Sequence, residues 1–119
     1  MARFDVYEMK RGSALVVDCQ ADLLDGLKTR VVVPLIAESE APKPARNLNP
    51  VFDLIGERYV LLTQFLSAVE LREMGRRVGS LESEGEVVLG ALDFLLTGVS
   101  ERHTILPFRC RSACKIDPV

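Results

Sequence analysis

The side chains most able to do chemistry lie near the end of this 119-residue sequence. His103 is the only histidine, and Cys110 and Cys114 follow it, so these three side chains are candidate metal ligands. Their Cys-x-x-x-Cys spacing is looser than in most zinc sites, and a fourth ligand is missing. A general-base histidine also needs an orienting partner and a pocket, which the neighbours of His103 do not indicate. We therefore expect no metal, no cofactor and no catalytic residue.

Common catalytic motifs are missing as well. The patterns G-x-x-x-x-G-K, G-x-G-x-x-G, H-E-x-x-H and G-x-S-x-G do not occur, which argues against the enzyme classes that they mark. Carboxylates cluster at Glu82, Glu84 and Glu86, directly before an apolar segment. Negative charge is favourable at the N-terminus of a helix, so we interpret this cluster as a helix start. The sequence thus shows none of the residue patterns that mark these enzyme classes.

The composition is typical of one globular domain, with 48% apolar residues, 27% charged residues and a formal net charge of −2. Domains that bind nucleic acid electrostatically are usually basic, so direct nucleic-acid binding is not expected. The odd number of cysteines and the lack of a signal peptide indicate the cytoplasm. No apolar run approaches the length of a membrane-spanning helix.

A helix is predicted from about residue 83 to about residue 96, because apolar residues recur with helical spacing from Val88 onward. Ser83 and Glu86 have the spacing of a capping box, and Gly98 can end the helix. Strands followed by one helix predict an α+β protein with a small antiparallel, SH3-like β-barrel. The strands are expected at residues 4–8, 14–18, 29–36, 50–54, 59–62 and 67–71.

Glycines mark the expected connections between these elements. Gly56, Glu57 and Arg58 predict a tight turn between two strands of a hairpin, and the segment from Gly75 to Gly79 predicts a polar connection. The apolar run at residues 31–33 predicts a central strand that is covered on both faces.

The loop after the second expected strand carries two leucines, Leu23 and Leu24, between Asp22 and Asp25. Loops run over the protein surface and rarely carry apolar pairs. Such a pair either closes a core or meets a partner.

This loop belongs to a series of short motifs along residues 3–99. Their order and spacing resemble the CcdB-type toxins, bacterial proteins that poison DNA gyrase. The series contains Phe4, Val6, Tyr7, Lys10, Arg11, Val17, Asp18, Gln20, 22–25, 30–35, 49–51, 67–69, Leu71, Met74, Gly75, Leu81 and 95–99.

The resemblance implies a homodimer of SH3-like barrels, each with one C-terminal helix. Such a toxin is not an enzyme; it wedges into the dimer formed by the A subunit of DNA gyrase and traps the cleaved DNA complex. A disordered segment of a partner antitoxin folds over the toxin and removes it from gyrase. Nucleic acid is bound only by the toxin–antitoxin complex. The gyrase-binding positions implied are Leu23, Leu24, Asp93, Leu96, Thr97, Gly98 and Val99.

Two helix positions depart from the resembled family. Thr97 stands where the family has a tryptophan that stacks on a gyrase arginine, and the chain contains no tryptophan. Asp93 stands where the family has an asparagine. Stacking of an aromatic ring on a cation contributes about 0.5–2 kcal/mol, so we expect poisoning to be weak.

Two alternatives remain open for the function. The MazF/Kid-type toxins use the same barrel as messenger-RNA endoribonucleases, which need a basic groove with a general acid and base. The other alternative is a non-toxic homologue that retains only antitoxin binding. The cations available for a ribonuclease groove are Arg3, Lys10, Arg11, Arg30 and Arg58.

Residues 100–119 lie beyond the resemblance, so we expect a toxin domain at residues 1–99 and a C-terminal extension after it. This tail is either native or a foreign addition to the domain. Ile105, Leu106 and Phe108 are its apolar anchors, and we expect it to fold over the last helical turn.

Overall fold

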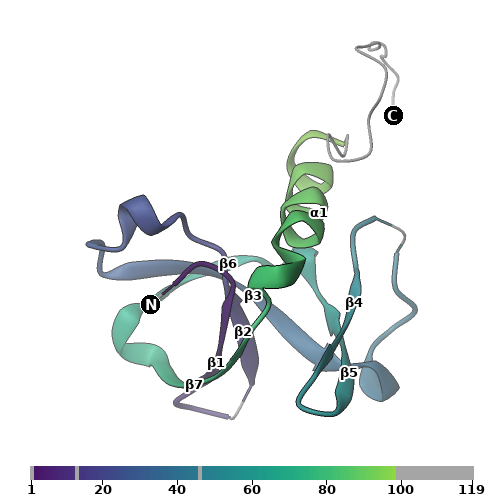
Figure 1. The fold of residues 1–119 in the computed structure, drawn as a ribbon, viewed down its shortest axis with the longest axis horizontal. Coiled ribbons are helices and arrows are strands. Elements are labelled where there is room, and N and C mark those ends of the chain that lie inside the picture. The colour runs from purple at the N-terminus through teal and green to yellow at the C-terminus, as the bar shows by residue number, and fades with distance from the viewer. Residues whose placement is uncertain (1, 13, 46, 99–119) are drawn as a thin grey trace.

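The computed structural model describes residues 2–12, 14–45 and 47–98 of the chain. Within these residues a single curled antiparallel sheet of seven strands is followed by one α-helix, which confirms the predicted α+β class (Figure 1). The elements are β1 (Asp5–Met9), β2 (Leu15–Asp18), β3 (Thr29–Ala37), β4 (Val51–Leu54), β5 (Glu57–Leu61), β6 (Ser67–Glu70), β7 (Met74–Ser80) and α1 (Gly85–Thr97).

Strand β3 is the centre of the sheet, as its run of valines predicts. One edge of β3 pairs with β2, and the other edge is shared between β6 and β5. Val32 and Val33 are both buried but belong to different apolar clusters, because successive side chains of a strand point to opposite faces. The sheet therefore has a large core on the face that the helix covers and a small cluster on the other face.

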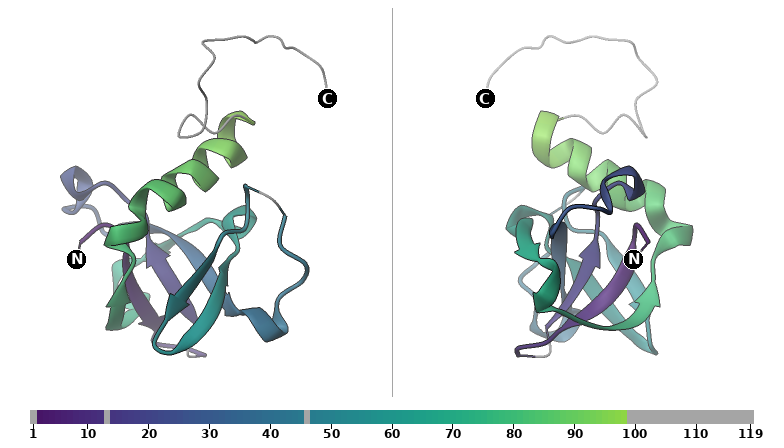
Figure 2. Two further views of the ribbon diagram at one scale, coloured as in Figure 1. Left: turned by 45° about the vertical axis from the view of Figure 1, so that its right-hand side comes forward. Right: turned by 90° about the vertical axis from the view of Figure 1, so that its left-hand side faces the viewer.

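The sheet curls into a half-barrel with the strand order β4-β5-β3-β2-β1-β7 (Figure 2). Register shifts between β1 and β7 mark the irregular pairing that bends such a sheet. The two ends of this order approach each other at Leu54 and Gly79. A β-carbon added at Gly79 would lie 3.1 Å from Leu54 Cδ1, so side-chain packing brings the outer strands together.

Helix α1 packs its first half on the large core and then rises away from the sheet (Figures 1 and 2). Val88 and Ala91 are buried against the core, while Leu96 near the end is 72% exposed. Gly98 ends the helix as predicted: its φ of 77° is in the left-handed region, and its N–H donates to the Phe94 carbonyl.

The predicted capping box at the start of the helix is wrong. Ser83 lies inside a 3₁₀ turn, Glu82–Glu84, and the helix begins only at Gly85, without a side-chain cap from Glu84. Ser80 supports the 3₁₀ turn instead, because its Oγ accepts a hydrogen bond from the Glu82 N–H at 3.1 Å.

Two predicted connections also need correction. The segment between Gly75 and Gly79 is not a polar connection but part of strand β7, which pairs with β1. The tight turn of the β4–β5 hairpin is made by Ile55 and Gly56, with φ values of 54° and 77°, so residues 57 and 58 already belong to β5.

Candidate functional site

The loop after β2 presents its leucines to solvent and does not bury them in the core. Leu23 is 92% exposed and Leu24 is 47% exposed. Both lie in a 3₁₀ turn, Asp22–Leu24, in which the Leu24 N–H donates to the Ala21 carbonyl. Leu27 adds a third exposed apolar side chain on the same loop, at 50% exposure. Sequence reasoning alone misses Leu27; the one signal for it in the sequence is that it is a third leucine in the same loop.

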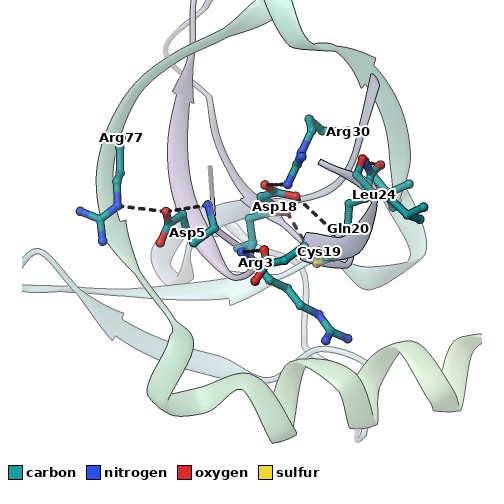
Figure 3. A network of polar contacts seen from close by, with 12 residues as sticks. Arg3, Asp5, Asp18, Cys19, Gln20, Leu24, Arg30 and Arg77 are labelled. Carbon is teal, nitrogen blue, oxygen red and sulfur yellow. Dashed lines mark hydrogen bonds and ion pairs between the residues drawn. The ribbon is translucent and has the colours of Figure 1, made fainter. Parts of the chain in front are cut away.

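The loop is tied to the segment that precedes β1. The Arg3 N–H donates a hydrogen bond to Asp22 Oδ1 at 2.8 Å (Figure 3). Asp22 is the first residue of the 3₁₀ turn, so this bond fixes the point at which the loop leaves the sheet. The apolar pair is consequently displayed on an anchored turn.

A buried ion pair lies where this loop leaves strand β2. Asp18, the last residue of β2, accepts a hydrogen bond from the guanidinium of Arg30 on β3, and the two side chains are 0% and 1% exposed (Figure 3). Nearby, Asp5 on β1 and Arg77 on β7 form a second pair at 3.2 Å. A buried charge requires a partner in this way, because an unpaired charge away from water is very costly.

The second candidate surface is the end of helix α1. Leu96, Thr97 and Gly98 are exposed, and Asp93 is half-buried. The Thr97 hydroxyl donates to the Asp93 carbonyl at 2.6 Å, so part of its hydrogen-bonding capacity is used within the helix. Val99, the last residue of the predicted surface, lies outside the described residues.

Within one chain the loop and the helix end are not brought together. The loop lies beside the N-terminus, whereas the last turn of α1 rises away from the sheet, as two views show (Figures 1 and 2). The predicted site is therefore two separate apolar surfaces on each chain.

Three of the five cations considered for an RNA-cleaving groove, Arg3, Arg30 and Arg58, make other contacts. Arg30 is fully buried with Asp18, which removes it from any surface groove. Arg58 on β5 pairs with Glu38 at 2.9 Å, and the Arg3 guanidinium lies 4.9 Å from the centre of the Phe4 ring. Lys10 and Arg11 line a small surface hollow together with Arg72 and Glu73.

Metal binding finds no support in the part of the chain that the structure describes, where no group of three or more His, Cys, Asp or Glu side chains could hold an ion. His103, Cys110 and Cys114 lie outside that part. The buried Cys19 donates a weak hydrogen bond to the Val17 carbonyl. Burial, with a smaller contribution from Asp18, raises the pKa of Cys19 to about 12, so it is a protonated core thiol.

Membrane insertion by a helix finds no support either. None of the helices in the described ranges combines the length and the apolar character that crossing a membrane requires.

Comparison with known families identifies the family of this fold. The sequence model of the CcdB protein family matches residues 3–98, which is most of the chain. The chain belongs to the CcdB family. CcdB proteins are toxins of toxin–antitoxin systems and act as non-enzymatic gyrase poisons. The match covers the whole described sheet and helix.

Proposed function

We propose that this chain is a non-enzymatic toxin that binds the A subunit of DNA gyrase through the loop leucines and the end of helix α1. The observation that carries the proposal is the 92% exposure of Leu23 on an anchored turn. Full burial of one leucine side chain contributes about 1.5–3 kcal/mol, and a folded chain gains nothing from leaving it in water. Leu24 and Leu96 offer further apolar contacts of the same kind.

Poisoning by this chain should be weak, because Thr97 occupies the position at which the family's tryptophan stacks on a cation. A threonine side chain has no π face, so the stacking contribution of about 0.5–2 kcal/mol is lost. Buried aromatic residues are also common energetic centres of interfaces. Asp93 adds a carboxylate in place of a neutral amide at the same surface.

We also propose that the toxin is a homodimer and that a partner antitoxin neutralises it in the cytoplasm, where gyrase works. Among the described residues β6 pairs with β3 alone, so its outer edge offers unpaired backbone groups. Leu71, directly after β6, is 40% exposed and adds apolar surface. Two-fold self-association is the commonest way to cover such a surface.

The test measures binding to the purified A subunit of gyrase by calorimetry and trapping of cleaved DNA by gel assay. Leu23→Ser should weaken binding at least about tenfold, because the variant loses a leucine side chain that would be buried on binding. Ile55→Ser is the matched control, because Ile55 is 63% exposed on the remote β4–β5 hairpin. Equal effects of the two substitutions would contradict the proposed surface.

The same preparation tests the two alternatives and the role of Thr97. Thr97→Trp, in a chain that ends at residue 99, should strengthen gyrase binding if the missing aromatic ring limits poisoning. A chain truncated there should keep the fold of the proposed 1–99 domain, as circular dichroism reports. RNA cleavage by the wild-type chain would favour the ribonuclease, and antitoxin binding without gyrase binding would identify a non-toxic homologue.

A further inference from the structure

The side chain of Gln20 bridges the central strand and the leucine loop. Gln20 follows β2 and is only 6% exposed. Its Oε1 accepts a hydrogen bond from the Val31 N–H of β3 at 3.2 Å, and its Nε2 donates to the Leu24 carbonyl at 2.9 Å (Figure 3). Its backbone N–H donates to Asp18 Oδ1 at 3.1 Å, so the buried ion pair holds it in turn. One residue thus connects the rigid part of the sheet to the turn that displays the apolar pair.

Gln20 holds the turn through its hydrogen bond to the Leu24 carbonyl. The carbonyl accepts from the Leu27 N–H at 3.2 Å as well as from Gln20. Leu23 is 92% exposed and Leu24 is 47% exposed, and neither belongs to an apolar core cluster, so core packing does not fix the turn. Polar contacts have to do so, and the bond from Gln20 is the one that comes from a buried side chain.

We propose that Gln20 is a positioning residue for gyrase binding, which holds Leu23 and Leu24 in the orientation that the partner meets. The inference rests on the proposed function, because it concerns the same loop. Gln20 does not touch gyrase; it lowers the entropy that the loop loses on binding by ordering the turn beforehand.

Gln20→Glu removes one of the two side-chain bonds selectively. The substitution keeps the length of the side chain and an oxygen that can accept from Val31, but it sets a carboxylate oxygen against the Leu24 carbonyl. Gln64→Glu is the matched control: it makes the same chemical change on an exposed side chain, where Gln64 Oε1 accepts from Asn49 Nδ2 at 2.8 Å. Comparison of the two variants separates the lost bond from the added charge.

Backbone ¹⁵N order parameters of residues 22–27 report directly on the loop. They should fall from about 0.85 towards 0.6 in Gln20→Glu and stay unchanged in Gln64→Glu. On acidification the new carboxyl group takes up a proton and regains a donor, so the order should recover in part; burial and the nearby Asp18 carboxylate raise the pKa of this group above the ordinary glutamate value. Asp18 accepts a hydrogen bond from the Gln20 N–H and pairs with Arg30, so these two charges act on the titration most directly. Asp22 and Asp25 lie on the same loop, and Arg3 is bonded to Asp22 through its backbone N–H.

Gyrase binding is the second measurement. The affinity of Gln20→Glu at neutral pH should be about tenfold lower than that of the wild type, as expected for one hydrogen bond. Antitoxin binding and dimerisation, measured beside it, should change less. If Gln20→Glu does not fold, Gln20→Met replaces it; this variant carries no charge, and it should lose loop order without recovery in acid.

The outcomes separate the inference from the function on which it rests. Unchanged order parameters in both Gln20 variants, or an equal loss in Gln64→Glu, would overturn the role of Gln20. A wild-type chain that does not bind the A subunit of gyrase would refute the proposed function, and the order parameters would still decide whether Gln20 fixes the loop.

Discussion

Removal of Arg30 should destabilise this protein more than any exposed arginine. In Arg30→Met the carboxylate of Asp18 stays where it is, 0% exposed, and its remaining partner among the described residues is the backbone N–H of Gln20. Breaking a buried pair by removing one partner costs about 3–5 kcal/mol, because an uncompensated charge is left away from water. That is a large fraction of the roughly 5–15 kcal/mol that stabilises an ordinary domain.

The assay is urea unfolding followed by circular dichroism. With a slope of about 1–3 kcal/mol per M, the midpoint should fall by roughly 1 M or more. Arg58→Met is the control, because the Arg58–Glu38 pair is 59% and 44% exposed and an exposed pair contributes about 0–1 kcal/mol. The double variant Asp18→Leu with Arg30→Met should recover most of the loss, since two apolar residues can replace a buried pair. If Arg30→Met and Arg58→Met have equal midpoints, the reasoning from burial is wrong.

Two further changes test the packing and the protonation of the core. Gly75→Ala places a β-carbon against the Glu8 carbonyl oxygen and should cost about 1–3 kcal/mol in urea unfolding, whereas Gly26→Ala, with nothing within 4 Å, should be nearly neutral. Because the pKa of Cys19 is raised to about 12, the native state keeps a proton that the unfolded chain releases above about pH 9. Cys19 should therefore lower the stability by up to about 1.4 kcal/mol per pH unit above pH 9, and Cys19→Ala should remove this contribution to the slope; an unchanged slope would contradict it.

A strand can be predicted well from the sequence when most of its residues are apolar and become buried in the core. The expected bounds of strand β3 agree within one residue at its end, because its valines and Leu35 fill both faces of the sheet. Strand β7 is not predicted from the sequence. Gly75 and two arginines give it the appearance of a connection, yet Gly75 is there because the β1 backbone comes too close for a side chain.

The candidate site is only partly predictable for a related reason. The leucine pair can be singled out from residue type and position, but only the structure shows that it is exposed. The Asp18–Arg30 pair spans 12 residues, and only the register between β2 and β3 brings its members together. Gln20 has no evident role in the family motif, because its partners, Val31 and the Leu24 carbonyl, are backbone groups that no residue pattern specifies.

The residues that we propose to meet a partner and the residues that make the core are separate sets in this molecule. Leu23 and Leu96 belong to neither apolar cluster, so either can be exchanged without opening a cavity. Substitutions at these positions can therefore change the binding partner without destabilising the fold. Thr97, exposed at the helix end, is an example of a position where such drift carries little structural penalty. A lineage built on this scaffold can change its target, or abandon it, long before it loses its architecture.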